Sequence, residues 1–579
     1  MTVDSTVRWI LIPISSLTLS TCLTQNTLAQ SLPPPGVTLP PETPETIEQT
    51  IPQPPASPFP SEPPTPPPQP QLQTPPSQPA PDITSPESDR DRILIKTIEV
   101  FGNTVLHPEI TALIEPYQNQ EASLEDLLNL RSKITQLYIE NGYITSGAFL
   151  VNNQELNQGD VQIQIVEGEL EQIEITGLNR LRESYVRRRL ELSTRPPLNQ
   201  QRLETTLQLL QLNPLFQQVN AELTAGNTPG RNILQIQLQE APAFGAGIAT
   251  ANTQSSSLGS VQNSINASHN NLLGFGDRIS ATYGITSGVN LYNLNYTLPV
   301  NARDGTLTLS YSNTNSQIIE EPFEDIKIRS ESRNISANFR QPLIYTPERE
   351  LGIGVAFDLR RSQTYILDDI PFSFSEGPDD GESKVTVIRF YQDWVNRSPG
   401  RVLAARSQFS FGIDAFDATI NDIGIDGRFF TWIGQFQWVE QLSPRALLVA
   451  RINTQLTPDT LLPIERFTIG GVDTVRGYSH NQRVGDNGIM GALEVRLPVT
   501  SNPNILQLSP FFEIGTVWNN QGITLEPATI AGLGLGLNWL ITPDLSLRLD
   551  YGIPLIDVDD EGDSLQDNGL YFSLRYQPF

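Results

Sequence analysis

The sequence predicts an all-β transmembrane barrel of sixteen strands, preceded by two α+β domains of order β-α-α-β-β and by a disordered proline-rich linker. Three observations support this prediction. The composition changes sharply near residue 92, a repeated order of strands and helices follows to about residue 242, and apolar residues then alternate with polar ones. A chain of 579 residues is long enough to require several domains.

The N-terminal segment has the pattern of a secretory signal peptide, which we place over 1–29. Arg8 precedes a run of apolar residues, and the small residues before Ala29 form a cleavage site. The single cysteine, Cys22, lies in this segment. Cleavage after Ala29 therefore excludes disulfides, thiol nucleophiles and cysteine-ligated metals from the mature protein. The residues before Cys22 leave a lipoprotein-type cleavage site open as the alternative.

Residues 30–92 are predicted to form a disordered linker. The stretch from 32 to 86 contains 22 of the 47 prolines, interleaved with Gln, Ser, Thr and Glu. Such a segment cannot sustain a helix, because proline lacks the backbone donor, and it has too few apolar residues to bury a core.

Two tandem units then follow, over 93–167 and 168–242. Each can form one three-stranded sheet under two helices. The first is expected to contain a strand over 93–100, helices over 108–114 and 123–141, and strands over 146–151 and 161–166. The second is expected to contain a strand over 170–176, helices over 182–190 and 200–212, and strands over 219–223 and 233–238.

The longer helix of the first unit has clear boundaries. Ser123 is a good N-cap residue, acidic residues follow it in the first turn, and Asn141-Gly142 ends the helix. The residues expected on its buried face are Leu127, Leu130, Ile134 and Leu137.

Period-two alternation dominates residues 243–579 and predicts an outer-membrane β-barrel. In Leu545–Gly552 the odd-numbered residues are apolar and the even ones small or charged, as expected when one face meets lipid and the other water. Many of the segments are near the 9 to 11 residues, roughly, that a tilted strand needs to cross a bilayer. The sixteen are 244–251, 257–269, 278–286, 290–299, 306–313, 328–341, 351–362, 383–394, 401–413, 429–442, 446–455, 488–499, 508–518, 528–540, 545–553 and 569–579.

The connections between these segments support the same prediction. Short turns alternate with long acidic loops, the arrangement typical of outer-membrane barrels. An even number of strands closes the sheet, and closure satisfies every backbone group without water. After the signal peptide, no run approaches the roughly 18 apolar residues that a spanning helix requires.

Enzymatic activity, cofactors and metals are not predicted. The sequence has no G-x-S-x-G elbow, no H-E-x-x-H motif and no phosphate-binding loop. The acidic stretch from Asp557 opens like a calcium loop, but Asn568 stands where a bidentate Glu is needed. The net charge of −27 argues against a nucleic-acid partner, because phosphates are neutralised by clustered Lys and Arg.

Two short patterns resemble a known family. The string Tyr138-x3-Gly142-Tyr143-x-Thr145 and the junction Val166–Leu170 are similar to the POTRA domains of two-partner secretion transporters of the haemolysin-activator type. The resemblance implies that these domains bind an unfolded client in the periplasm, where an exposed sheet edge can accept an extended peptide. The alternative is that the strands pair only within their own domain. The candidate edge residues are Ser146, Phe149, Val151, Val219 and Leu223.

A second motif lies in the long segment between the strands expected at 446–455 and 488–499. Val475-Arg476-Gly477-Tyr478 matches the tip of the sixth loop in these transporters, a loop that folds back into the barrel lumen in that family. Nearby glycines supply the backbone freedom that tight reversals need. A solvated loop arginine is the alternative.

An arginine inside a narrowed lumen requires a carboxylate partner. Phe511, Glu513 and Gly515 share one face of the next strand but one, and we predict that Glu513 binds Arg476 bidentately. The family pattern usually has Asp at this position. Ordinary barrel packing is the alternative role for Phe511 and Gly515. The turn from Asn271 to Asp277 adds weaker support for the resemblance.

The resemblance implies an outer-membrane transporter that recognises an unfolded exoprotein in the periplasm and secretes it through its barrel. The expected partners are this client, large and β-helical, and outer-membrane lipid, and the transporter is expected to be a monomer. A factor that inserts other barrels into the membrane is the main alternative, and a passive porin is a third. The family often has an N-terminal plug helix, but the proline-rich segment supplies no obvious one, so we expect either none or a different plug.

Overall fold

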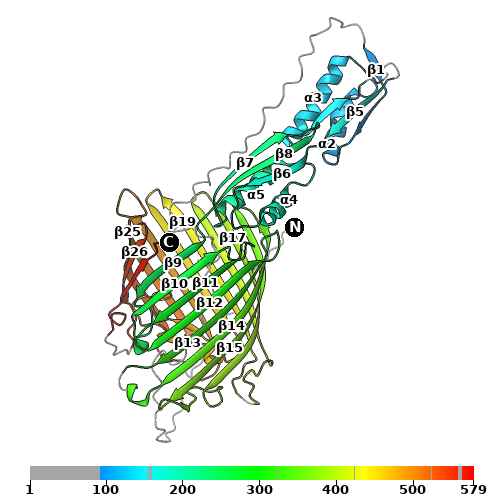
Figure 1. The fold of residues 1–579 in the computed structure, drawn as a ribbon. Helices are drawn as coiled ribbons and strands as arrows, with labels where there is room; N and C mark the ends of the chain where they lie inside the picture. The colour runs from blue at the N-terminus through cyan, green and yellow to red at the C-terminus, as the bar shows by residue number, and fades with distance from the viewer. Residues whose placement is uncertain are drawn as a thin grey trace, which may run out of the picture. The chain divides into compact units, whose positions relative to one another are not determined.

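In the computed structural model, two small α+β domains are followed by a closed β-barrel (Figure 1). The structure describes residues 92–578, apart from residues 153, 155–158, 321–322, 423, 523 and 559–563. The predicted signal peptide with Cys22, nearly all of the predicted linker and most of the acidic stretch after Asp557 lie outside these residues. Within them, no helix combines the length and the apolar content that crossing a membrane would take.

The first α+β domain contains a small second sheet that the sequence did not indicate. Its elements are β1 (Ile93–Ile95), β2 (Thr97–Phe101), α2 (His107–Ile114), a 3-10 turn (Glu115–Tyr117), β3 (Gln120–Ala122), α3 (Leu124–Glu140), β4 (Gly147–Leu150) and β5 (Asp160–Val166). The prediction of one strand over 93–100 is wrong. The backbone turns aside at Lys96, whose amide donates to Gly159 O (2.7 Å), so β1 pairs with β3 while β2 runs parallel to β5.

Helix α3 begins with the predicted N-cap. Asp126 N donates to Ser123 Oγ (3.2 Å) and Ser123 N donates to the Asp126 carboxylate (2.9 Å), which forms a capping box. The hydrogen bonds from the Ser123 backbone and hydroxyl lower the pKa of Asp126. Such a cap stabilises a helix by about 1 kcal/mol. Leu127, Leu130 and Ile134 are buried as predicted, and Leu137 is half-buried and packs against the same core, which also contains Tyr138.

The residues that resemble the POTRA pattern meet at the end of the first domain. Tyr138 donates its hydroxyl proton to Glu167 Oε1 (2.9 Å), which also accepts from Thr104 N (2.7 Å). Burial raises the pKa of the Tyr138 hydroxyl, so it remains a donor. A Cβ on Gly168 would lie 1.9 Å from Thr145 Oγ1, and therefore only glycine fits at this junction.

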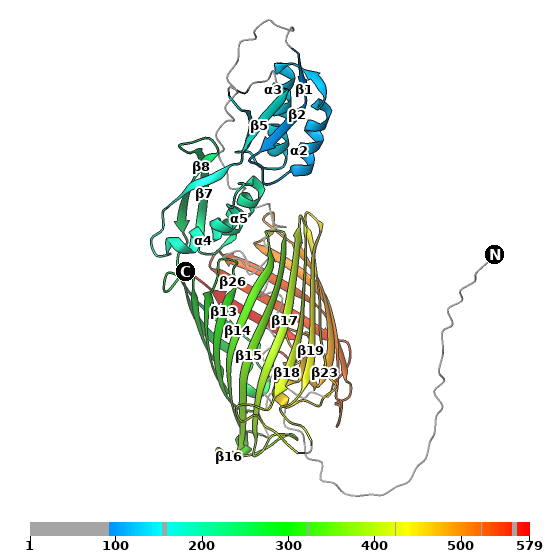
Figure 2. The ribbon, with the colours of Figure 1, turned by 90° about the vertical axis from the view of Figure 1, so that its right-hand side faces the viewer.

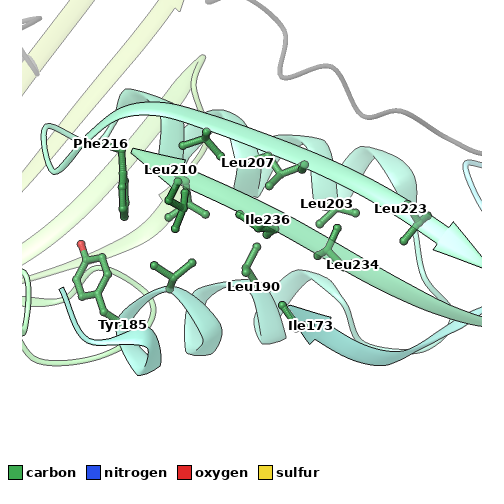
Figure 3. Close-up of a cluster of buried hydrophobic side chains, with 14 of the residues drawn as sticks. Ile173, Tyr185, Leu190, Leu203, Leu207, Leu210, Phe216, Leu223, Leu234 and Ile236 are labelled. Carbon is green, nitrogen blue, oxygen red and sulfur yellow. The ribbon is translucent and has the colours of Figure 1, made fainter. Parts of the chain in front are cut away.

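The second α+β domain has the predicted order of elements. They are β6 (Glu169–Thr176), α4 (Glu183–Ser193), α5 (Gln200–Leu212), β7 (Phe216–Ala225) and β8 (Arg231–Glu240), with the strand order β6-β8-β7. Leu203 and Leu207 of α5 pack with Leu190 of α4 against Leu234 and Ile236 of β8 (Figure 3). This buried layer holds the two helices on one face of the sheet.

The C-terminal part forms a closed antiparallel barrel of sixteen strands, as predicted. Neighbouring strands such as β13, β14 and β15 run side by side and inclined in its wall (Figure 2). The first and last strands close the sheet through four residue pairs, from Ser573 with Ala251 to Tyr576 with Ile248. The strands are β9 (Phe244–Ala251), β10 (Gln262–Asn270), β11 (Arg278–Ile285), β12 (Val289–Pro299), β13 (Thr306–Gln317), β14 (Arg329–Tyr345), β15 (Arg349–Ile366), β17 (Glu382–Ser398), β18 (Arg401–Ile413), β19 (Phe430–Ser443), β20 (Ala446–Leu456), β23 (Asn487–Pro498), β24 (Leu506–Trp518), β25 (Thr529–Thr542), β26 (Leu545–Pro554) and β27 (Leu570–Tyr576).

Several strand ends differ from the prediction. The segment expected from residue 257 starts as a 3-10 turn (Ser256–Leu258), and β10 begins only at Gln262. Several strands are longer than expected, and two-residue β16 (Ile370–Pro371) extends the sheet beside β15. The last strand ends at Tyr576, ahead of Pro578, which lacks the donor that a ladder requires.

The early turn from Asn271 to Asp277 is held by its own last residue. The buried Asp277 carboxylate accepts from Leu273 N (3.0 Å) and from the Tyr296 hydroxyl (3.1 Å). These hydrogen bonds close the β10–β11 hairpin at this turn.

Candidate functional site

The connection between β20 and β23 is a folded hairpin. After a 3-10 turn (Pro463–Glu465), β21 (Phe467–Ile469) pairs antiparallel with β22 (Arg483–Gly485). The tip between these strands contains Gly470, Gly471 and Gly477, all with positive φ. Other residues rarely adopt such angles, so the glycines permit the reversals that direct the tip toward the barrel wall.

Arg476 lies at this tip and is completely buried. Its Nη2 donates to Glu513 Oε1 at 2.5 Å, and its Nε lies 3.0 Å from Oε1 and 3.1 Å from Oε2. The backbone N of Arg476 also donates to Glu513 Oε2, at 2.8 Å. The guanidinium carbon also lies 3.4 Å from the centre of the Phe511 ring. The structure thus brings Arg476 together with Glu513, which is fully buried on β24. The two form a bidentate, charge-assisted pair, which is stronger than a hydrogen bond between neutral groups.

Two further carboxylates, which the sequence analysis missed, complete the site. Arg476 Nη1 donates to Asp550 Oδ1 (2.6 Å) on β26, and Nη2 donates to Glu494 Oε2 (3.2 Å) on β23. Arg496 donates to Glu494 (2.8 Å) and Arg548 to Asp550 (2.7 Å). Three guanidinium groups therefore face three carboxylates, and this charge balance offsets part of the desolvation that burial imposes.

A signal for the missing carboxylates was present in the sequence. Glu494-x-Arg496 and Arg548-x-Asp550 each place an ion pair two residues apart in an alternating strand, and therefore on one face. Arg476 needed more than one acceptor, because a guanidinium has five N–H donors. The strand register, which brings the carboxylates of β23, β24 and β26 to one arginine, cannot be predicted from these local patterns.

Glycines on the barrel wall form the seat for the loop tip. A Cβ on Gly532 of β25 would lie 2.0 Å from Arg476 O, and one on Gly552 of β26 would lie 2.5 Å from Gly477 N. The backbone of the tip therefore approaches the backbone of the wall directly. Predicted site residue Gly515 faces the same tip, where its Cβ would lie 3.1 Å from Ile469 Cδ1.

Two tyrosines fasten the tip on either side of Gly477. The Tyr571 hydroxyl accepts from Gly477 N (2.9 Å) and donates to Tyr478 O (2.6 Å). Tyr478 itself reaches the β25 backbone, where its hydroxyl lies 2.8 Å from Ala531 O. Val475 is fully buried in an apolar cluster with Met490 and Val517. Each of the four residues of the Val475–Tyr478 motif therefore contacts the barrel wall. On β24, Phe512 and Ile514, which alternate with Phe511, Glu513 and Gly515, are exposed.

The predicted client-binding strands lie at sheet edges, but most of the named side chains do not face outward. β4 is an outer strand of the order β2-β5-β4, and β7 is an outer strand of the second sheet. Ser146, Val219 and Leu223 are buried, Val151 is half-buried, and Phe149 is 48% exposed. The edge amides of Ala148 and Val219 donate to helical side chains at 3.1 and 2.8 Å. The acceptors are Thr135 Oγ1 and Gln211 Oε1.

Comparison with known proteins decides the family. The family described as haemolysin secretion/activation protein ShlB/FhaC/HecB matches residues 230–539, more than half of the chain. The chain belongs to this family. A ShlB-type POTRA domain matches residues 93–168, and a second POTRA-type domain, described as surface antigen variable number repeat, matches residues 169–241. The chain is accordingly an outer-membrane transporter of two-partner secretion, with its POTRA domains in the periplasm.

Individual relatives agree with this assignment. The heme/hemopexin transporter protein HuxB of Haemophilus influenzae is 22% identical over 82% of this chain and 85% of its own length. The structure of CdiB from Escherichia coli covers 86% of this chain and 94% of its own, with a TM-score of 0.66 and 21% identity. BamA from Haemophilus ducreyi lacking POTRA domains 1–3 gives a TM-score of 0.52 at 13% identity over 84% of this chain and all of its own. BamA, which represents the assembly-factor alternative, is thus a more distant relative.

Proposed function

We propose that the β21–β22 hairpin with Arg476 at its tip is a structural latch, which fixes the loop inside the barrel of this transporter. The observation that carries the proposal is the fully buried arginine with its three carboxylates. Removing one member of such a cluster leaves an uncompensated buried charge, at a penalty of about 3–5 kcal/mol. All three carboxylates are paired with the guanidinium group, an arrangement suited to holding the backbone of the tip in place.

We also propose that the client is a large β-helical exoprotein, secreted unfolded by a single copy of the chain. The HuxB and CdiB relatives are named as transporters. The sheet closes on itself through the pairs between β27 and β9, so one chain makes a complete pore. The sequence offers no nucleotide-binding motif, so folding of the client outside the cell is the source of free energy that we assign to export.

The client can be identified by comparing proteins released by cells with and without this chain. We expect one large protein to disappear from the medium when the chain is deleted and to return on complementation. Mass spectrometry of the medium and of the membrane fraction measures both. Loss of several membrane-inserted barrels, with no change in the medium, would instead establish the assembly-factor function.

Phe149 is the side chain best placed to test client binding at a POTRA edge. It is the exposed apolar residue on β4, and burying such a ring against a client would contribute roughly 1–3 kcal/mol. Phe149→Ser is therefore expected to lower the rate of client release about tenfold or more. The amount of client in the medium, normalised to transporter in the outer membrane, measures this effect.

Leu94→Ser is the matched control for Phe149→Ser. Leu94 is 53% exposed on β1, which belongs to the separate β1–β3 sheet and lies outside the sheet edge proposed to bind the client, so its loss should leave secretion unchanged. Equal secretion by the Phe149→Ser variant and the wild type would exclude this edge as a client contact.

A further inference from the structure

The loop carries a second buried charge at its root. Glu465 stands at the end of the 3-10 turn just before β21 and is 5% exposed. Its Oε1 accepts from Arg360 Nη1 and from Arg389 Nη2, both at 2.9 Å, and its Oε2 accepts from Arg389 Nη2 at 3.1 Å. One carboxylate on the loop therefore meets two guanidinium groups on the barrel wall.

The wall residues at this second cluster are held in place by their own partners. Arg389 Nε donates to Asp358 Oδ2 (2.5 Å), and its Nη1 donates to Ser410 Oγ (3.0 Å). Asp358 also accepts from Ser336 Oγ (2.6 Å). Two arginines thus face two carboxylates, so the root cluster is balanced in charge like the cluster around Arg476.

The two clusters lie on different arcs of the barrel. Asp358 and Arg360 belong to β15 and Arg389 to β17, whereas the carboxylates around Arg476 belong to β23, β24 and β26. In the order of the wall, β18, β19 and β20 separate β17 from β23. The polarity is also reversed: at the root the loop supplies the carboxylate and the wall the arginines.

Each cluster is accompanied by an apolar contact of its own. Leu461, Leu462 and Ile464 of the root pack with wall residues Val385 and Val387. At the tip, Ile469, Val475 and Tyr478 pack in a separate cluster with residues of β23, β24 and β25. Because both ends combine an ion cluster with a buried apolar patch, each has the features of an independent attachment.

We propose that Glu465 is a second positioning residue, which anchors the root of the loop to Arg360 and Arg389 and makes the loop a strap fixed at two places on the lumen wall. This inference rests on the proposed role of the Arg476 loop as a latch. It adds that the root can detach from the wall while the tip stays bound, and that the tip can detach while the root stays bound.

Cysteine reactivity in the purified full-length protein can separate the two anchors. Cys22 is the only cysteine of the chain, so a single reporter is unambiguous once Cys22 is replaced by serine. Leu462→Cys reports on the root and Val475→Cys on the tip, because both side chains are fully buried. We expect Glu465→Gln to accelerate maleimide labelling at 462 by about tenfold or more, and to leave labelling at 475 unchanged.

The reciprocal change should have the opposite pattern. Arg476→Ala is expected to expose the reporter at 475 and to leave that at 462 protected. Arg360→Met provides a second root variant, and Arg406→Met is the matched control. Arg406 is a buried wall arginine on β18 that donates to Gln408 and stacks on Tyr391, so its loss removes the same charge without touching the strap.

Ion conductance in planar bilayers supplies a readout that needs no client. Root release should raise the mean conductance of the Glu465→Gln and Arg360→Met variants above that of Arg406→Met. Unchanged labelling at 462 in both root variants would overturn the second anchor, and equal exposure of both reporters would overturn the independence of the two ends. Neither result depends on secretion, so a failure here is distinguishable from a failure of the latch in export.

Discussion

Replacing Arg476 with alanine is expected to abolish secretion while the barrel remains folded. The change leaves Glu513, Asp550 and Glu494 without their shared guanidinium in a buried site, a penalty of about 3–5 kcal/mol that is relieved when the tip leaves its seat. The strands themselves keep every ladder bond. Client in the medium measures export, and retention of the folded, heat-modifiable form on electrophoresis measures the barrel.

Two control variants sharpen this result. Arg476→Lys keeps the charge but loses the planar fork that serves several carboxylates at once, so we expect secretion well below the wild type. Arg445→Ala removes an exposed arginine from the short β19–β20 turn and should secrete normally. Normal secretion by a folded Arg476→Ala variant would disprove the latch.

Filling the seat beneath the tip is expected to have an effect as large as removing the arginine. In Gly532→Val every charge remains, but the new Cβ would lie 2.0 Å from Arg476 O, and the tip must move away. Branched side chains are otherwise well accommodated in strands. We therefore expect secretion to fall at least about tenfold in a barrel that still assembles, since tip detachment forfeits several charged hydrogen bonds. The same secretion and electrophoresis measurements apply.

Gly491→Val is the matched control for Gly532→Val. Gly491 lies on β23, which β24 separates from β25, and a Cβ there would meet no atom within 4 Å. The same substitution should therefore be silent at residue 491. If both valine variants secrete equally, close approach of the tip to β25 has no role in export.

Local patterns were sufficient for the elements of the fold. The signals that predict the capped helix α3, the helix over 200–212 and the sixteen alternating segments all come from residues close together in the sequence. The prediction was wrong where a distant residue intervened. The carbonyl oxygen of Gly159 accepts from the Lys96 amide, at the point where one expected strand is split into β1 and β2.

The sequence by itself determined the class of this protein: two α+β domains, a sixteen-stranded barrel, and an arginine loop with Glu513 as its partner. Only the tertiary structure brought Asp550 and Glu494 to Arg476, placed Gly532 and Gly552 beneath the tip, and attached Glu465 to Arg360 and Arg389. The reason is physical. Alternation fixes which face of a strand a residue occupies, whereas the register between strands and the path of a long loop decide which faces meet.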